Sequence, residues 1–526
     1  MRRRLSLIEK AKLYPLAKVT VPLITGIVVG NSFAIRQSLA VPVVIVSLLV
    51  ALFSYRNLIF RNIVFYVAVF FLGIVIYNKS SQDLSVPSSD SSIFQAVLMT
   101  SPKRHGKVVR CDIIVTTGNM SGKRLQASIM RDTIEKRYLY LKPGVGISVN
   151  ASISPVKDYR KGNFNYKNYL HSHGVSGTAF IPFNNWIFTK TSLSSLSTLN
   201  RLRLKAAKYQ CKLGDKYRIS GLENEGLAIT SAMTLGDKSM LDKAMRDRFS
   251  VTGVSHVLAM SGLHLGILYL FLTFAWGRRK RWVAVSLFNI LAVWAFVFIA
   301  GMPLSLVRSA LMLSVFCMLD VIHRNTQPIN TLALSALLII AANPESIFDV
   351  GFQMSFMAVL FILAICPKIN AMVCNSIVFR YRILRNLLNF INVSCVAQVA
   401  VAPLVAYYFS RFSSYFLLSN FVAIPCTYII IVCGMLLLAI PFPAVQDILA
   451  KAISLTTNFM DKCLTWISSL PGSSIENIRI DRLGVCVIYA VIFLLCYFFL
   501  IRKTDAVFSR QHCNIKLAFL HKNNEK

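Results

Sequence analysis

A twelve-residue stretch, SHVLAMSGLHLG (255–266), carries chemically active side chains inside a run apolar enough to cross a membrane. It holds His256, Ser261 and His264, whose imidazole and hydroxyl groups donate and accept hydrogen bonds near neutral pH. Read as one helix, the stretch places His256 and His264 near one stripe, about 12 Å apart along the axis. That separation is too large for one metal ion. No Cys/His cluster elsewhere has metal-ligand spacing, so we predict neither a metal site nor a cofactor.

Ser261 also allows an interpretation as a nucleophile. The segment AMSG (259–262) resembles the G-x-S-G helix of intramembrane serine hydrolases, in which a histidine acts as the base. His264 follows three residues later on the same predicted helix, which is a poor arrangement for a nucleophile–base pair. We therefore favour a non-enzymatic role. Gly262 and Gly266 form a G-x-x-x-G step and are predicted to pack against another helix.

Further polar residues occur within apolar runs at similar predicted depth. A charged side chain in a membrane span usually faces a cavity or a partner. Arg308 and Asp349 could pair with each other, and Pro425 is expected to interrupt its helix. The set predicts a polar vestibule, although isolated helix-packing hydrogen bonds are the alternative. The channel-lining candidates are His256, Ser261, His264, Arg308, Asp349, Gln353, Gln398 and Asn420.

Composition places these residues in a membrane protein. The chain has 526 residues and is 55% hydrophobic. Many runs reach the ~17–25 residues that span a bilayer. Lys and Arg number 57 against 22 Asp and Glu, a net charge of +35. Cytoplasmic loops collect Lys and Arg, but this excess is larger than such loops explain.

The apolar runs define a polytopic α-helical fold with about twelve transmembrane or re-entrant helices. Three spans lie within 1–77, and 252–501 forms the main helical domain. Between them, 192–251 reads as amphipathic or interfacial helices, and 502–526 as a basic cytoplasmic tail. The basic N-terminus predicts an uncleaved anchor in the cell inner membrane. Charged loops then place both termini in the cytoplasm.

Residues 78–191 differ from the rest. Alternating stretches separated by turn residues predict a small all-β, OB-like domain on the extracytoplasmic side. The stretches are 108–115, 124–131, 138–142, 146–153 and 176–183. Cys111 and Cys211 fall in the soluble-looking part of the chain, and the sequence leaves their pairing open.

This β domain is strongly basic, with 16 Lys or Arg against 6 Asp or Glu. Positive-inside bias does not explain an excess on the outer side, whereas phosphate binding does. A solvated basic surface is the other interpretation. Aromatic residues interleaved with the cations could stack on bases. The DNA-binding candidates are Lys103, Arg104, Lys107, Arg124, Lys157, Arg160, Lys161, Phe164 and Tyr166.

Several of these segments together resemble the ComEC family of competence proteins. The segments are GVSHVLAMSGLHLG (253–266), PLSLVRSALM (303–312), DVGFQMSF (349–356), YFLLSNFVAIP (415–425), LGDKSML (235–241) and FNYKNYLHSHGVSG (164–177). The resemblance covers nearly all of 14–501. It departs from many members in lacking the H-x-H-x-D-H signature of a C-terminal metallo-β-lactamase-like domain, so we expect no nuclease site in this chain.

The resemblance implies an inner-membrane channel that takes up single-stranded DNA during natural transformation. Its implied partners are single-stranded DNA, membrane lipid, periplasmic DNA-receptor proteins and a cytoplasmic helicase-like ATPase, with a separate nuclease possible. No G-x-x-x-x-G-K-[ST] loop occurs in the sequence, so the ATPase would be a different chain. The alternative function is a secondary transporter of a smaller anionic or polymeric solute, a class that also uses interrupted helices.

Overall fold

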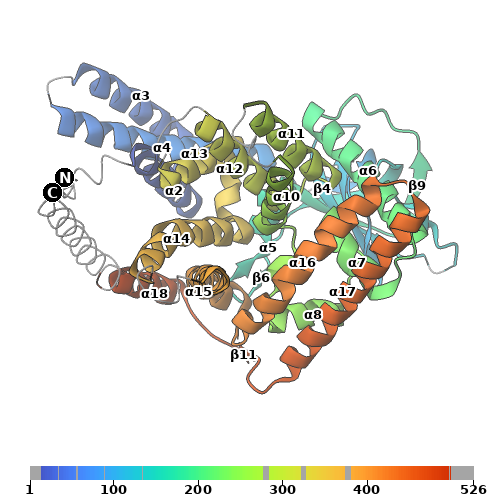
Figure 1. Ribbon diagram of the computed structural model, residues 1–526. Helices are drawn as coiled ribbons and strands as arrows, with labels where there is room; N and C mark the ends of the chain where they lie inside the picture. The colour runs from blue at the N-terminus through green and yellow to red at the C-terminus, as the bar shows by residue number, and fades with distance from the viewer. Residues whose placement is uncertain are drawn as a thin grey trace, which may run out of the picture.

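The computed structural model describes residues 14–33, 35–54, 57–87, 89–132, 134–276, 283–321, 327–373, 381–496 and 498. Most of this chain is helical, and a small β region lies to one side of the helices (Figure 1). The side chains of Arg160 and Lys161 are outside the described part, as are the basic loops between 277 and 282, 322 and 326, and 374 and 380. The topology predicted from those loops, and from the 502–526 tail, therefore stays a prediction.

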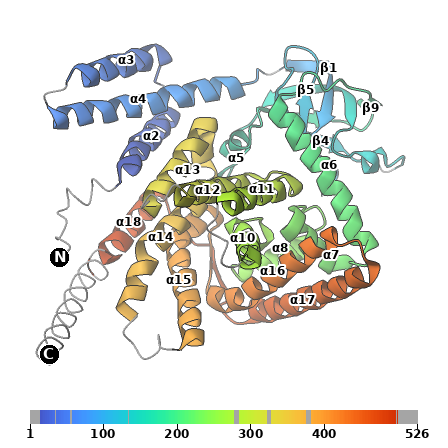
Figure 2. The same ribbon diagram turned by 45° about the horizontal axis from the view of Figure 1, so that its top comes forward.

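Three apolar helices open the chain: α2 (Pro15–Ser32), α3 (Gln37–Phe53) and α4 (Leu58–Leu84). Asn57 caps α4 by accepting hydrogen bonds from the backbone N–H groups of Ile59 and Phe60. In Figure 2, α3 and α4 form a hairpin that projects away from the rest of the molecule. The structure continues α4 past residue 77, and that helix leads directly to the β region.

Seven strands form the main sheet: β1 (Ser89–Leu98), β2 (Lys103–His105), β3 (Val108–Val115), β4 (Arg124–Met130), β5 (Gly146–Pro155), β8 (Gly177–Ile181) and β9 (Trp186–Thr189). The hydrogen-bonded order is β1-β3-β4-β8-β5-β9. Because β1 also pairs with β5, five of the strands close on themselves. Only β4 and β8 run parallel. We call this closed unit the barrel.

Alternation of side chains explains the barrel core. In β3, Val109 and Cys111 are buried while Arg110 and Asp112 are more exposed, as period-two packing requires, whereas the end of the strand from Ile113 on is buried on both faces. The stretch 138–142 was predicted as a strand and is instead part of a 3₁₀ turn, η1 (Arg137–Tyr140). Its buried residues, Tyr138 and Leu141, are three apart, which is a helical spacing.

The crossover from β5 to β8 carries a short hairpin and a helix. The hairpin pairs β6 (Arg160–Lys161) with β7 (Phe164–Asn165), and α5 (Tyr166–Ser172) follows. The side chain of Asn165 caps α5 through the backbone N–H of Asn168. The connection begins and ends in barrel strands that pair antiparallel with each other, so closure of the barrel also positions α5.

After the barrel, α6 (Thr198–Ile219) runs from the β region along one side of the helices (Figure 2). Then come α7 (Asn224–Thr230), the π-helical turn η2 (Ser231–Leu235) and α8 (Lys243–Val251). Gly236 ends η2 with φ +74°, and an added Cβ there would lie 2.8 Å from Sδ of Met260. Only glycine fits both conditions without strain.

The stretch 252–276 was predicted as one helix, and this prediction is wrong. The structure has α9 (Ser255–Leu258), an extended break at Ala259, and α10 (Gly262–Trp276). His256, Met260 and His264 therefore do not form a helical stripe. Next come α11 (Val283–Ile299), α12 (Leu304–Val321) and α13 (Pro328–Ala342).

The last part of the chain alternates long helices with short strands. Its elements are η4 (Pro344–Phe348), α14 (Val350–Val373), α15 (Arg382–Phe409), β10 (Arg411–Ser413), α16 (Phe416–Ala439), α17 (Pro443–Ser469), β11 (Ser474–Glu476) and α18 (Arg482–Leu495). Strand β10 pairs with β11. Pro425 was predicted to interrupt its helix, but α16 continues through it.

Five helices are long and apolar enough to cross a membrane: α2, α4, α14, α15 and α16. Six shorter apolar helices accompany them among the described residues. Large apolar side chains on α3 such as Leu52 and Phe53 are exposed, as a lipid-facing surface requires. This arrangement is that of a multi-pass membrane protein with an inserted β region.

Candidate functional site

A buried ion pair joins α12 to the segment just before α14. Nη1 of Arg308, on α12, lies 2.8 Å from Oδ2 of Asp349, just before α14. Both side chains are more than nine-tenths buried. The same Asp349 oxygen accepts the backbone N–H of Phe352 at 2.9 Å, which places a carboxylate at the positive end of α14. The predicted pairing of Arg308 with Asp349 is therefore present.

Glycine makes this approach possible. A Cβ on Gly351 would lie 2.9 Å from Nη2 of Arg308. Within the described residues, Nε of Arg308 has no hydrogen-bond partner, so one donor of the buried guanidinium is unused. An unused donor beside a buried charge is costly and marks a place where a ligand or water can bind.

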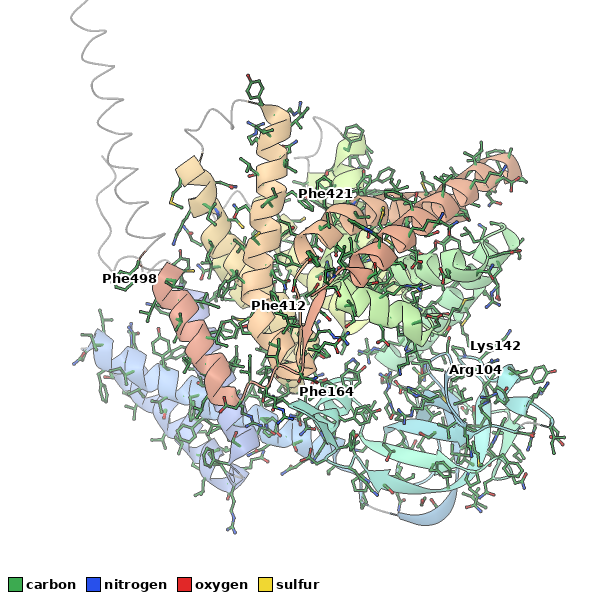
Figure 3. All side chains as sticks on the ribbon, turned by 90° about the horizontal axis from the view of Figure 1, so that it is seen from below. Arg104, Lys142, Phe164, Phe412, Phe421 and Phe498 are labelled. Carbon is green, nitrogen blue, oxygen red and sulfur yellow. The ribbon has the colours of Figure 1, made fainter. Side chains whose placement is uncertain are left out.

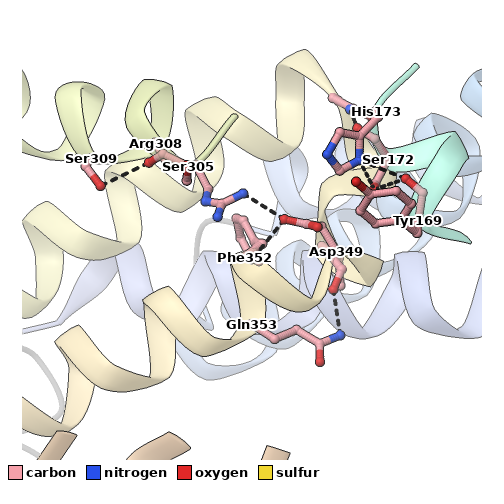
Figure 4. A network of polar contacts seen from close by, with 11 residues as sticks. Tyr169, Ser172, His173, Ser305, Arg308, Ser309, Asp349, Phe352 and Gln353 are labelled. Carbon is pink, nitrogen blue, oxygen red and sulfur yellow. Dashed lines mark hydrogen bonds and ion pairs between the residues drawn. The ribbon is translucent and has the colours of Figure 1, made fainter. Parts of the chain in front are cut away.

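The barrel contributes side chains to the same place. In Figure 4, Asp349 lies between Arg308 and the α5 residues Tyr169, Ser172 and the adjoining His173. Tyr169 and His173 are close enough to feel the charge of Asp349. Burial lowers the pKa of His173, so the imidazole is neutral at pH 7. Asn343 fixes the contact by donating to the Ser172 carbonyl at 2.8 Å.

Gln353 extends the polar network towards α15. Its Nε2 donates to the Ile347 carbonyl at 2.9 Å, and its Oε1 accepts the hydroxyl of Tyr408 at 2.8 Å. The amide is therefore held from both sides. Arg308, Asp349 and Gln353 form a continuous polar strip between α12 and α15.

Ser261 and His264 are hydrogen-bonded to each other at the start of α10. Nδ1 of His264 lies 3.1 Å from the Ser261 hydroxyl and accepts the Ser261 backbone N–H at 3.2 Å. This is one half of a capping box, with histidine in the place of the glutamate that reaches back to the backbone N–H at the helix start. In the described part of the chain, Nε2 of His264 has no partner, so no carboxylate orients the ring as a catalytic triad would require.

The two glycines of the G-x-x-x-G step differ. A Cβ on Gly262 would lie 3.1 Å from Oγ of Ser309, so α10 and α12 are in close contact there. This contact brings the Ser261–His264 cap next to the helix that carries Arg308. No atom of the described residues lies within 4 Å of a Cβ added to Gly266, so the packing role predicted for it stays a prediction.

Three other lining candidates are not joined to this strip. His256 is exposed on α9. Asn420 is buried on α16, and among the described residues its Oδ1 has no partner. Gln398 is half-buried on α15. Their channel-lining role stays a prediction.

A cluster of cations lies where the barrel meets the segment between η2 and α8. Arg246 donates to the Lys238 carbonyl at 2.8 Å. Burial, together with the positive charges of Lys103 and Arg246, lowers the pKa of Lys238 to about 8. None of the three forms an ion pair within the described residues. We call Lys103, Lys238 and Arg246 the cationic cluster.

Two aspartates lie close by in the sequence without forming an ion pair with this cluster. Asp237 accepts the backbone N–H of Ser239 at 2.9 Å, and Asp242 caps α8 through the N–H of Met245 at 2.6 Å. Cations with no carboxylate at ion-pair distance can bind an anion. The cluster also approaches the α10 cap, because the charge of Lys238 reaches His264.

The DNA-binding candidates on the barrel differ in whether their charged groups already have partners within the protein. Lys103, Arg104 and Lys107 are exposed on β2 and its turn. Figure 3 shows Arg104, with Lys142, on the side of the barrel that faces the helices. Arg124 pairs with Asp112 at 2.5 Å and donates to the His173 carbonyl, so its guanidinium is already used.

The remaining candidates gather around α5. Lys157 is exposed. Tyr166 donates to Oε1 of Gln126 at 2.7 Å. Phe164 packs against Tyr169 with ring centroids 5.8 Å apart and lines a cavity of about 570 Å³ between the barrel and the helices. The DNA-binding role of all these residues stays a prediction.

The profile of the family described as "Competence protein" matches residues 233–502, more than half of the chain. The chain belongs to the competence protein family. The match begins within η2. It covers Lys238, the Asp242 cap of α8, the Ser261–His264 pair at the start of α10 and the Arg308–Asp349 pair. The barrel lies outside the matched residues.

Two curated proteins are similar to the chain. The competence protein is 26% identical over 400 residues to "ComE operon protein 3" of Bacillus subtilis strain 168, covering 74% of this chain and 47% of that protein. It is 27% identical over 173 residues to "Uncharacterized protein MG316" of Mycoplasma genitalium, covering 33% of this chain and 41% of that one. The chain thus spans less than half of the length of these relatives. No solved structure matches it.

Sequence reasoning missed part of the site. LGDKSML (235–241) was noted as a motif, but neither Lys238 nor Arg246 was selected. Tyr169 was also missed, although it lies in the segment FNYKNYLHSHGVSG, and Tyr408 was missed because aromatic residues in apolar runs are usually core. Cys111 and Cys211 are free thiols, and Cys211 lies 3.3 Å from the Ser101 hydroxyl. In the described part of the chain, no group of His, Cys, Asp and Glu could hold a metal.

Proposed function

We propose that this competence protein is the inner-membrane channel through which single-stranded DNA enters during natural transformation. Family membership supports a role in competence. The observation that supports the proposal is the cationic cluster: Arg246 donates to the Lys238 carbonyl, the charge of Lys103 on the barrel acts on Lys238, and none of the three forms an ion pair within the described residues. Polyanions bind such unpaired cations, and the cluster adjoins the polar helix start at His264.

The barrel is the proposed strand-binding module. Its closed five-stranded path with one parallel pair supports an OB-like fold, a class that binds oligonucleotides. Exposed cations on β2 supply phosphate contacts, and the aromatic residues around α5 supply stacking surfaces. The same proposal places the barrel on the outer face, since α4 enters it and α2 to α4 cross the membrane three times.

Transport requires an energy source outside this sequence. We propose a cytoplasmic helicase-like ATPase as that partner. Periplasmic receptor proteins would deliver duplex DNA, and a separate nuclease would remove the second strand. Membrane lipid surrounds the apolar helices. The channel itself performs no covalent step.

The test is DNA import by cells that lack the protein. Labelled duplex DNA is supplied, and label protected from external nuclease is scored. The deletion strain is complemented with wild type, Lys238→Met or Lys462→Met at matched membrane abundance. Lys462 is exposed on α17 and serves as the matched charge control.

We expect the deletion to keep surface-bound DNA and to lose protected DNA. Lys238→Met should lower protected DNA about tenfold, the value of one charge-assisted contact, while Lys462→Met restores import. Unchanged import in the deletion strain would refute the channel and favour a solute transporter. Equal import by the two lysine variants would remove the cationic cluster from the pathway.

A further inference from the structure

A second potential binding site lies on the opposite side of α5 from the barrel core. The cavity of about 570 Å³ is bounded by the end of α2, the β6–β7 hairpin with α5, the start of α14, the end of α15 and the start of α18. Figure 3 shows Phe164 at this junction of the barrel with the helices. The volume falls in the ~300–1,000 Å³ range of small-molecule sites. The names of the two similar proteins do not refer to such a site.

The lining has an unusual composition for a gap between apolar helices. Five aromatic rings face it, together with five Asn or Gln side chains and one arginine, Arg482. The lining contains no Asp or Glu. Aromatic faces with amides and a single cation fit a flat heterocycle that carries a negative charge. A cationic ligand is disfavoured, because Arg482 would repel it and no carboxylate of the lining would offset its charge.

Some of these groups are fixed by the protein. Nε of Arg482 donates to the Tyr407 hydroxyl at 3.3 Å, and the Tyr408 hydroxyl donates to Gln353. The Tyr407 and Tyr408 rings meet edge to face with centroids 4.8 Å apart. Asn163 donates to the Tyr407 and Ile480 carbonyls, which holds the hairpin against the helices. The cavity wall is therefore ordered before any ligand binds.

Other lining groups are free to bind. Within the described residues, the Tyr169 hydroxyl, the Asn168 amide and the terminal nitrogens of Arg482 have no hydrogen-bond partner, and Arg482 has no acidic partner. Tyr169 is partly exposed; the Tyr166 ring stacks with it, with centroids 6.1 Å apart and an interplanar angle of 20°, and the His173 ring lies 4.3 Å away at 41°. The exposed part of this aromatic ring, one amide and one forked cation thus point to a ligand with a planar ring and a phosphate.

We propose that this cavity binds one nucleotide of the single strand. Its base stacks against the exposed part of Tyr169 and hydrogen-bonds with the Asn168 amide, which both donates and accepts and so suits any base, while Arg482 contacts its phosphate. The proposal rests on the proposed function and assigns it a specific base-holding site beside the Arg308–Asp349 pair. The stacking is sequence-tolerant, because every base presents a π-face. The site would hold the strand between transport steps rather than select a sequence.

The experiment uses the full chain in lipid nanodiscs and fluorescent oligothymidylate as the probe. Binding is compared with an oligonucleotide of equal length that carries abasic positions. The variants are Tyr169→Leu and Arg482→Gln, with Arg479→Gln as the matched control. Arg479 is exposed, lies three residues from Arg482 and does not line the cavity.

Tyr169→Leu should weaken oligothymidylate binding about 5- to 100-fold, the range measured for loss of one stacked base, and should leave abasic binding unchanged. Arg482→Gln should weaken both probes, whereas Arg479→Gln should match wild type. A strand of 5-iododeoxyuridine should cross-link to the cavity in the wild-type chain. That readout needs no substitution, so it decides the case if a variant misfolds.

The outcomes separate the two proposals. If wild type binds no oligonucleotide, the proposed function fails along with the site. If wild type binds and imports DNA but the cavity variants match Arg479→Gln and no cross-link maps to the cavity, the site proposal alone is wrong. If native mass spectrometry finds an anionic phospholipid that Arg482→Gln releases, with DNA binding unchanged, the cavity is a lipid site and the proposal is likewise overturned.

Discussion

At the scale of single residues, the Arg308–Asp349 pair combines structural and functional demands. Each charge is buried, so each depends on the other for compensation. Removing one partner leaves an uncompensated charge, whereas replacing both with apolar residues removes the cost as well as the gain. This asymmetry separates the contribution of the pair to stability from any contact with DNA.

Single substitutions in this pair should therefore be more harmful than the double substitution. We expect Arg308→Met or Asp349→Leu to destabilise the chain by about 3–5 kcal/mol, and the double variant to recover most of that loss. Thermal unfolding in detergent measures all four chains. If the stability lost in the double variant equals the sum of the losses in the two single variants, the two charges do not compensate each other.

Lys238 gives a pH dependence that can be measured. Its pKa of about 8 lies below the ordinary lysine value, so the ammonium group loses its proton as pH rises from 7 to 9. Binding of single-stranded DNA should weaken over that interval, because the cationic cluster loses one charge. Lys238→Arg should remove this pH dependence, since arginine stays protonated. Binding that weakens equally in Lys238→Arg would assign the effect to another group.

At the scale of elements, η4 packs against α5. Its Glu345 is buried, and within the described residues one carboxylate oxygen has no partner. Burial raises the pKa of Glu345 to about 7, although the positive charge of Lys167 on α5 acts in the opposite direction. The protonated carboxyl group is therefore the form that the folded state prefers.

The sign of the resulting pH effect follows from that preference. A carboxyl group whose pKa is raised on folding stabilises the fold fully below about pH 4.5, and this contribution is lost as pH rises through about 7. We expect thermal stability in detergent to fall between pH 5 and pH 8. Glu345→Gln should flatten the curve and raise the melting temperature at pH 8. A variant that melts below wild type at pH 8 would show that the ionised carboxylate is stabilising.

Element by element, the sequence predicted what depends on short-range patterns. The alternation in 108–115 and 124–131 located β3 and β4 because one face of each strand is buried. YLYLK was misread because its buried residues are three apart. The break at Ala259 was missed because no Pro or Gly occurs between His256 and Ser261, and the extended backbone there is imposed by tertiary contacts rather than by local propensity.

In the site, too, local patterns were predicted correctly and some contacts between distant segments were missed. Arg308 and Asp349 were predicted because a charge in an apolar run requires a partner. The cationic cluster was not predicted, because Lys103 lies in the barrel and Lys238 lies after α7, and no local pattern indicates that they meet. The cavity was missed for the same reason, since its walls come from the first and last described helices together with the hairpin.

At the scale of the whole molecule, one side chain connects the barrel with two distant helices. Asn163 donates at 3.0 Å to the Tyr407 carbonyl near the end of α15 and at 2.9 Å to the Ile480 carbonyl just before α18. Two hydrogen bonds contribute about 1 kcal/mol each. The hairpin is therefore held where it closes the proposed base-holding cavity.

Loss of this side chain should loosen the hairpin without unfolding the barrel. In Asn163→Ala we expect faster hydrogen exchange over 160–172, with β3 and β4 unchanged, because their bonds are internal to the barrel. Asn119→Ala, in an exposed turn, is the matched control. Uniformly faster exchange across the barrel would mean that the hairpin and the barrel open together as one folding unit.

The closed path of the barrel also has a consequence for biosynthesis. All of its strands occupy one stretch of chain, 89–189, and α5, which contacts η4, lies in the connection between β5 and β8 inside that stretch. The barrel can thus fold to completion before the ribosome has made α12, α14 or α15. Helices synthesised later then assemble against a finished surface, so errors in their order of insertion would not disturb the barrel.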